Sequence, residues 1–147
     1  MTNFAVSDTR LVKSGWNLTV NGQSGTGKSA VFAQYCPKAS CGPDAEGYVT
    51  GGHALAANSL RLNSTGASMS GQLGSTGSTP QLQCAASCAL DSASAVKVVS
   101  AETSEGTWTT TGWSATSLQL SAPTTLKALP SGEVYRVNIL WTLASGP

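Results

Sequence analysis

The stretch Tyr135-Arg-Val-Asn-Ile-Leu-Trp-Thr-Leu143 alternates between two sets of residues. Apolar or aromatic side chains stand at every second position, and mostly polar ones stand between them. A period of two over so long a segment is typical of an antiparallel strand with one buried face. Residues 16–20 repeat the pattern, because Trp16, Leu18 and Val20 alternate with Asn17 and Thr19. We therefore expect both segments to be strands, and we expect them to be neighbours in one sheet.

Weaker alternation predicts further strands, separated by turn signals such as Asn21-Gly22, Ser131-Gly132 and Pro123. Several short strands at such intervals favour an all-β fold, an antiparallel β-sandwich of immunoglobulin-like architecture formed by the single domain 1–147. Loop excursions are expected near residues 36–53 and 64–80, and the one weak helix candidate is 54–58. The weaker strands are expected at residues 4–6, 59–62, 95–100, 108–110 and 117–121.

Composition and charge exclude several classes of function. The 147 residues carry a formal net charge of +1, and only 10% of them are charged, against about 25% in typical soluble domains. Such a chain lacks the basic surface that nucleic acids or anionic membranes need. No run approaches the length of a membrane span, so neither nucleic acid nor membrane insertion is expected. Ser and Thr make up about a quarter of the residues, which favours an exported domain, with Met1 as the start of an excised mature domain rather than a cytoplasmic start.

The four cysteines form two close pairs, Cys36 with Cys41 and Cys84 with Cys88. A zinc site would use four thiolates, but such sites typically place about two residues between paired ligands. Here four and three residues intervene. We therefore predict two disulfide bonds, each pinning a short loop, and no metal. Disulfides in turn indicate an oxidising, extracellular compartment.

Residues 22–29, Gly-Gln-Ser-Gly-Thr-Gly-Lys-Ser, match the phosphate-binding P-loop pattern letter for letter. That chemistry needs a buried parallel strand before the loop and a helix after it. The preceding strand alternates, and Cys36-Pro37 follows too soon for a full crossover helix. A flexible hairpin loop is therefore the favoured interpretation, and an enzyme that uses this loop remains a minor alternative.

Other catalytic patterns are weaker still. Ser94-Ala-Val-Lys97 resembles an acylation motif, but Ser and Lys three apart in a strand face opposite sides. The single histidine, His53, has no nucleophile elbow to serve. Asp44 and Glu46 are too few ligands for calcium. No catalytic residue and no cofactor is expected, and the chain is predicted not to be an enzyme.

The four tryptophans are candidate glycan contacts, since an indole face can stack on the C–H face of a sugar ring. Trp16 and Trp141 occupy regular strand positions, which favours a place in the core. Trp108 and Trp113 flank a turn around Gly112. These two are therefore the better candidates for an exposed aromatic platform, with core packing as the alternative.

Two Trp-x-Leu motifs stand near opposite ends of the chain, Trp16-Asn-Leu18 and Trp141-Thr-Leu143. Their surroundings are Phe4-Ala-Val-Ser-Asp-Thr-Arg10, Gly15-Trp-Asn-Leu-Thr-Val20 and Ile139-Leu-Trp-Thr-Leu-Ala-Ser-Gly-Pro147. With them the chain resembles the WxL domain of Gram-positive surface proteins, whose opening V-x-D-x-R and G-W-x-L-x-V patterns pair with a closing L-x-W-T-L. Ile139 departs from the first closing position, and the cysteine pairs and the Gly/Ser-rich loop lie outside the family pattern. The matching positions are Asp8, Arg10, Trp16, Leu18, Trp141 and Leu143.

This resemblance implies a secreted, non-catalytic module that attaches non-covalently to bacterial cell-wall peptidoglycan or an associated glycan. The alternative is a structural or assembly module that binds other surface proteins or forms a filament. Asp8 and Arg10 are two apart in an extended segment, so an ion pair between them is as plausible as ligand contact. The Trp-x-Leu spacing is also what two paired core strands would produce.

Overall fold

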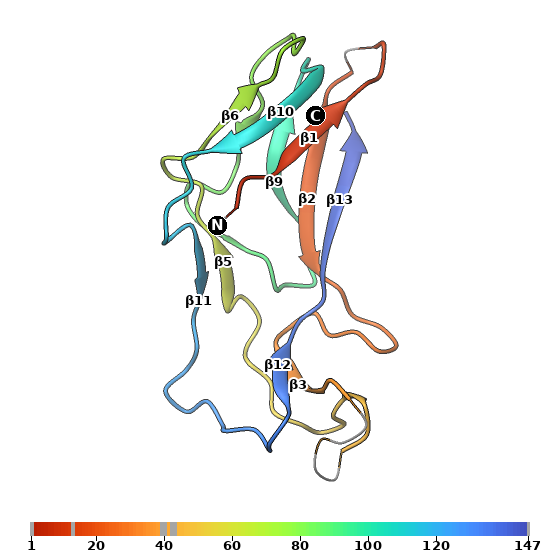
Figure 1. Ribbon diagram of the computed structural model, residues 1–147, viewed down its shortest axis with the longest axis vertical. Coiled ribbons are helices and arrows are strands. Elements are labelled where there is room, and N and C mark those ends of the chain that lie inside the picture. Colours follow the sequence, from red (N-terminus) through yellow and green to blue (C-terminus); the bar gives the residue numbers. More distant parts are fainter. Residues whose placement is uncertain (1, 13, 39–40, 42–43, 147) are drawn as a thin grey trace.

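The computed structural model describes residues 2–12, 14–38, 41 and 44–146, and these residues form strands, turns and loops without a helix. The predicted all-β antiparallel class is therefore confirmed (Figure 1). The helix candidate at 54–58 is wrong, because this segment is an irregular turn whose Leu55 amide bonds to the Phe32 carbonyl (2.8 Å). No helix long and apolar enough to cross a membrane occurs in the described residues.

In the described part of the chain, thirteen short strands make four antiparallel sheets, with strand orders β13-β2-β9-β7, β1-β10-β6, β11-β5-β8 and β12-β3-β4. The strands are β1 (Ala5–Asp8), β2 (Trp16–Gly22), β3 (Ala33–Cys36), β4 (Gly47–Tyr48), β5 (Leu60–Leu62), β6 (Ser68–Gly71), β7 (Gln81–Leu82), β8 (Cys88–Ala89), β9 (Val96–Ala101), β10 (Gly106–Thr111), β11 (Leu118–Leu120), β12 (Val134–Arg136) and β13 (Ile139–Ser145).

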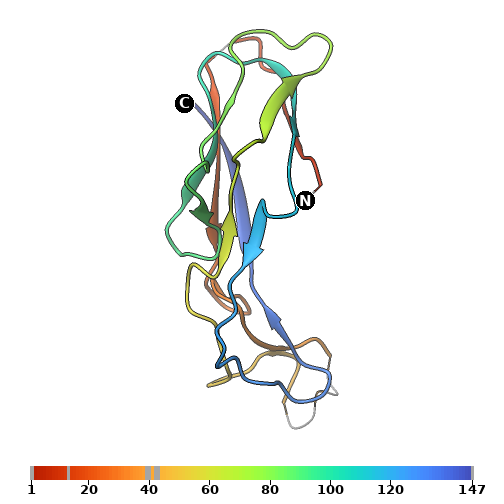
Figure 2. The same ribbon diagram turned by 90° about the vertical axis from the view of Figure 1, so that its left-hand side faces the viewer.

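The sheet that contains β2 and the sheet that contains β10 form two layers at one end of the molecule (Figure 2). One main core lies between them, because alternating side chains of β2 and β10 are buried. A register shift between Leu18 and Thr19 interrupts the pairing of β2 with β9, and both Val98 and Val99 are buried there. The arrangement is sandwich-like, and the immunoglobulin-like architecture stays a prediction.

The two strands that carry the Trp-x-Leu motifs are neighbours, as expected. In the register of β13 with β2, Trp141 lies opposite Val20 and Leu143 lies opposite Leu18. The predicted strand over residues 135–143 is interrupted, because β12 ends at Arg136 and β13 begins at Ile139. The Asn138 carbonyl at this break accepts the Gln23 amide (2.8 Å).

The sheet of β5 contributes Leu62 to the main core, whereas the sheet of β3 lies at the far end of the molecule from β10 (Figure 1). Asp91 is fully buried and organises the start of β5, since its carboxylate accepts the Ser59 and Leu60 amides at 3.0 Å each. In the sheet of β3, the Tyr35 and Tyr48 rings meet edge to face at 5.0 Å. The Arg136 guanidinium lies 4.4 Å from the centre of the Tyr35 ring.

Both predicted disulfides are confirmed, Cys36–Cys41 and Cys84–Cys88. Cys84 belongs to the main core, whereas the first bond closes the loop after β3. The cysteines are therefore not thiolate ligands of a zinc ion. The expected polar loop at 64–80 contains a strand, β6, which pairs with β10 and buries Met69.

Candidate functional site

The sandwich is open along one side, between strand β1 and strand β13. Each is the outer strand of its sheet. Trp141 and Leu143 lie opposite buried residues of β2, so their side chains belong to the inner face of the sheet. Yet 41% of Trp141 and 53% of Leu143 is exposed. The reason is that the facing sheet ends at β1 and leaves β13 uncovered.

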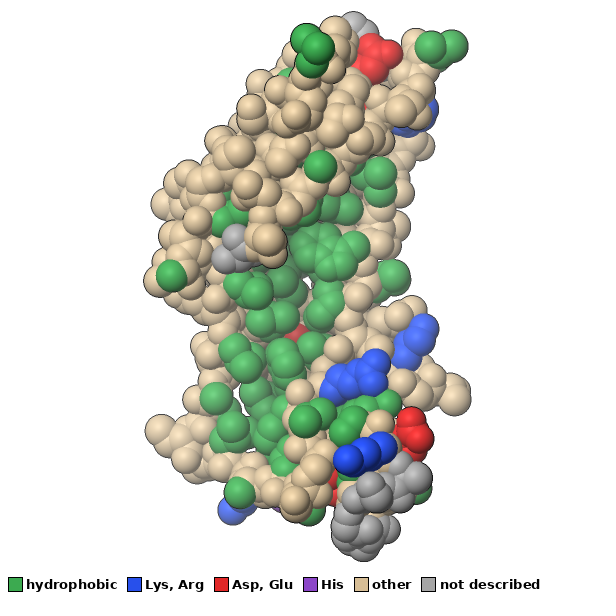
Figure 3. Space-filling view, in the orientation of Figure 1, with side chains coloured by type: hydrophobic (Ala, Val, Ile, Leu, Met, Phe, Trp, Pro, Cys, Tyr) green, Lys and Arg blue, Asp and Glu red, His purple; other side chains and the backbone are tan. Residues whose placement is uncertain are grey.

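This opening is a slot of about 680 Å³. Figure 3 shows it as part of a hollowed apolar region in the middle of this face of the molecule. Apolar side chains from three strands and from the segment before β1 form most of its surface, and short polar side chains stand at its margin. The lining residues are Thr2, Asn3, Phe4, Ala5, Val6, Ser7, Leu18, Trp141 and Leu143.

Phe4 joins two of the tryptophans into an aromatic row beside the slot. Its ring centre lies 6.0 Å from that of Trp141 and 6.2 Å from that of Trp113, in tilted arrangements. Such offset geometries suit the ring quadrupoles. No sequence pattern indicates this role, because Phe4 stands in a weak strand pattern and the contact joins residues more than one hundred positions apart.

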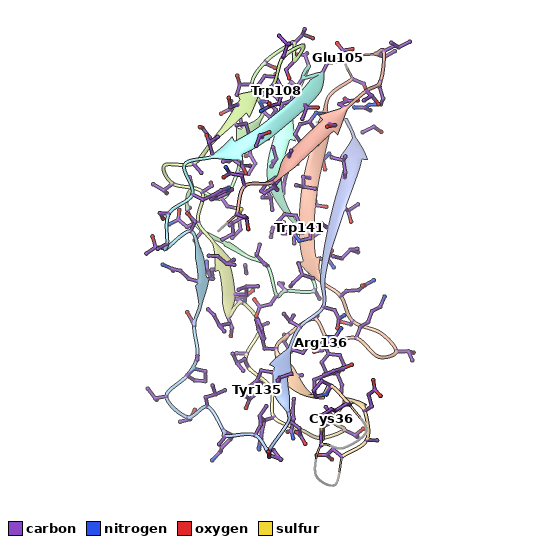
Figure 4. All side chains as sticks on the ribbon, viewed as in Figure 1. Cys36, Glu105, Trp108, Tyr135, Arg136 and Trp141 are labelled. Atoms are coloured by element: carbon purple, nitrogen blue, oxygen red, sulfur yellow. A yellow bond between two sulfur atoms is a disulfide. The ribbon has the colours of Figure 1, made fainter. Side chains whose placement is uncertain are left out.

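The expected exposed platform of Trp108 and Trp113 does not form. Trp108 is only 6% exposed and donates its indole N–H to the Glu105 carbonyl (3.1 Å). Trp113 is half-buried and packs against the core. Figure 4 shows Trp108 beside β10, well apart from Trp141. The platform does not form because strand β10 directs Trp108 into the core. The more accessible indole is that of Trp141, although the strand pattern favours a core position for it.

Trp16 is a core residue, as expected, with 2% of its surface exposed. It also borders a smaller hollow of about 230 Å³ that adjoins the slot, since both are lined by Ser7 and Leu143. The indole nitrogen of Trp16 is buried without a hydrogen-bond partner among the described residues. The smaller hollow is more polar than the slot, because Asp8, Arg10 and Ser145 line it as well.

Asp8 and Arg10 bind each other, so the ion pair that the sequence suggested is formed. Arg10 donates from Nε to Asp8 Oδ1 (2.8 Å) and from Nη2 to Asp8 Oδ2 (2.6 Å). The same Nη2 also donates to the Gly15 carbonyl (2.6 Å). These bonds tie the end of β1 to the start of β2, so the pair closes the loop between them.

The hydrogen bond from Arg10 lowers the pKa of the buried Asp8 carboxyl, against the opposing effect of burial. The same bond raises the pKa of Arg10. Both groups are therefore charged at neutral pH. The smaller hollow is lined by this pair of opposite charges.

The P-loop match forms a tight turn, in which the Lys28 amide donates to the Gly25 carbonyl (3.0 Å). The next regular element is strand β3 rather than a helix. The Ser29 hydroxyl donates to the Val31 carbonyl (2.7 Å). The arrangement that holds phosphate and magnesium is therefore not formed here. The segment is a turn, but not the loop of a hairpin between its flanking strands, because β2 and β3 belong to different sheets.

The residues of the other weak catalytic motifs do not come together into one site. His53 is exposed and bonds to Gln34 through its backbone. Ser94 and Lys97 are both exposed, outside the slot. Asp44 and Glu46 lie by a shallow hollow near β4. Within the described ranges, no three His, Cys, Asp or Glu side chains gather where they could hold a metal ion.

No family model, curated protein or solved structure matches this chain. The resemblance to the WxL domain thus stands on the motif residues alone. What the structure adds is their placement: Leu18, Trp141 and Leu143 line the slot, and Trp16 and Leu143 line the hollow beside it.

Proposed function

We propose that the chain is a secreted, non-catalytic module that attaches non-covalently to bacterial cell-wall peptidoglycan or an associated glycan. The slot between β1 and β13 is the proposed contact surface. The observation that carries the proposal is the half-exposed Trp141, which stands beside Phe4 in an open slot bordered by both Trp-x-Leu strands.

The chemistry of the slot suits a sugar polymer. Indole and phenyl rings bind the apolar C–H face of a sugar, while polar groups at the margin can bond to its hydroxyls. Asn3, Thr2 and Ser7 supply such groups along the slot, and Asp8, Arg10 and Ser145 supply them in the adjoining hollow. An open slot also admits a polymer that continues beyond the contact, which an enclosed pocket would not.

Retention on purified cell wall stripped of protein tests the proposal. We expect wild-type chain to be retained, and we expect Trp141→Ala and Leu143→Ala to weaken retention about tenfold. A loss of this size corresponds to about 1.4 kcal/mol of binding free energy, which is reasonable for removing an aromatic or aliphatic contact.

Leu120→Ala provides a matched control, because Leu120 is 52% exposed on β11 and does not line the slot. Its retention should equal that of the wild type. Equal loss in Leu143→Ala and Leu120→Ala would show that the slot is not the contact surface, and no retention of the wild type would contradict wall attachment.

The second candidate is the structural or assembly module. The observation that favours it is the free edge of β13, where Leu140, Trp141 and Leu143 are all at least 39% exposed. Exposed apolar strand edges are sites where another chain can add a strand. Absence of retention on stripped wall, together with binding to a surface protein, would favour this candidate.

A further inference from the structure

We propose that β13 pairs edge to edge with β13 of a second copy of this chain, in an antiparallel register centred on Thr142. The two β13-β2-β9-β7 sheets then form one continuous sheet across a twofold axis. This pairing goes beyond wall attachment and does not depend on it, because it uses the backbone edge of β13.

The edge of β13 lacks the usual protection against pairing. Soluble proteins commonly guard a free edge with charged side chains, proline or a bulge. Residues 137–146 contain no Asp, Glu, Lys, Arg or Pro. The register of β13 with β2 runs without a shift from Ile139 to Ser145. The edge is therefore straight, uncharged and seven residues long.

The backbone groups that face outward can be identified from the ladder with β2. At its two ends, Asn138 accepts the Gln23 amide (2.8 Å) and Gly146 donates to the Gly15 carbonyl (3.1 Å). Antiparallel ladders alternate between bonded and non-bonded pairs. Even-numbered residues of β13 thus face β2, and Ile139, Trp141, Leu143 and Ser145 direct their amides and carbonyls to the free side.

A register centred on Thr142 brings these outward residues together. It places Trp141 opposite Leu143 of the second copy and Ile139 opposite Ser145, each twice by symmetry. All four outward residues of one strand then meet outward residues of the other, so every free amide and carbonyl of the two edges finds a partner. Cross-strand pairs of an aromatic and an aliphatic side chain are favourable. The edge of β13 is therefore complementary to itself, which a twofold dimer requires.

The area available predicts a weak dimer. Seven paired residues extend about 24 Å, and such a contact covers less than the about 800 Å² per partner that stable complexes bury. Charge gives no obstacle, since neither edge carries any. We therefore expect dimers to form at high protein concentration and to dissociate on dilution.

Sedimentation velocity over a range of concentrations tests this pairing with the chain and two charge variants. Thr142 is exposed and does not line the slot, so Thr142→Lys and Thr142→Glu should fold normally. In the proposed register residue 142 faces its own copy at about 4.5 Å between Cα atoms. Like charges there should weaken the dimer about tenfold or more. An equal mixture of the Lys and Glu variants should dimerise again.

Ser70→Lys is the matched control, because Ser70 is an exposed residue on β6, an edge strand of the other sheet. It should dimerise as the wild type does. The proposal is overturned if the wild-type chain stays monomeric at every concentration. That result is expected if the edge of β13 pairs only with a different protein. A dimer that Thr142→Lys leaves unchanged also overturns the proposal. Wall retention of the Thr142 variants is a separate measurement, so failure of one proposal can be told from failure of the other.

Discussion

Gly15 shows how one residue sets the geometry of the opening motif. Its backbone has a φ of 70°, and its carbonyl accepts both the Arg10 guanidinium and the Gly146 amide. A Cβ atom at this position would collide with the backbone oxygens of Ala101 and Glu102. The residue before Trp16 must therefore be glycine, for reasons of structure alone.

Replacing Gly15 by Ala should destabilise the fold by about 3 kcal/mol or more, because both the left-handed conformation and the collision are costly. Urea unfolding followed by circular dichroism measures the loss. Gly25→Ala is a useful comparison, since its φ of 143° is also costly for alanine but nothing lies within 4 Å of a Cβ there, so the difference between the two variants measures the collision. Equal effects of the two substitutions would contradict the role given to Gly15.

The Asp8–Arg10 pair predicts a specific dependence of stability on pH. The pKa of Asp8 is below its ordinary value of 3.8, chiefly because Arg10 donates to the carboxylate. The ionised carboxyl is favoured in the folded state, so its stabilising contribution is complete above about pH 3.8 and disappears as the pH falls through the folded-state pKa.

Asp8→Asn removes this titration. Denaturant unfolding at a series of acidic pH values should show the wild type losing more stability on acidification than the Asn variant. Parallel pH profiles for the two chains would mean that the ion pair does not form in solution.

At the level of single elements, the sequence predicts the long strands and three short ones, β1, β5 and β11, but not β3, β4, β6, β7 or β8. Strands β2 and β13 are long enough for a period of two to be visible, and their pairing followed from the shared motif. Residues 64–80 read as a polar loop, and strand β6 within them is hard to predict, because only Met69 among its four residues is buried. The strand forms through backbone pairing with β10, a strand that lies about forty residues further along the chain, so the residues of β6 alone do not reveal it.

The disulfides are also local elements, and chain entropy gives their expected contribution. They close loops with sequence separations of 5 and 4 residues, so each should stabilise the fold by about 2 kcal/mol. Replacing Cys36 and Cys41 by Ala should cost about this amount in denaturant unfolding. Replacing Cys84 and Cys88 should cost more, because Cys84 also packs in the main core. Unchanged stability on reduction of the wild type would contradict both bonds.

At the scale of the whole molecule, the open slot is the feature that the sequence could not predict. Alternation assigns Trp141 and Leu143 to the inner face of their sheet, and this assignment agrees with the structure. Whether an inner face is covered depends on how many strands the opposite sheet contains. Among the described residues, a three-stranded sheet faces a four-stranded one, so Trp141, which is expected in the core, is accessible instead.

The accessibility of the four indoles provides the most direct measurement of the proposed glycan contact. Trp16 and Trp108 are buried and Trp113 is half-buried, so Trp141 is the indole that a ligand in the slot would touch. Soluble peptidoglycan fragments should change the intrinsic tryptophan fluorescence of the wild type. The change should vanish in Trp141→Phe and persist in Trp113→Phe. A fluorescence change of the same size in Trp141→Phe, or none in the wild type at saturating fragment, would contradict the slot as the site of wall attachment.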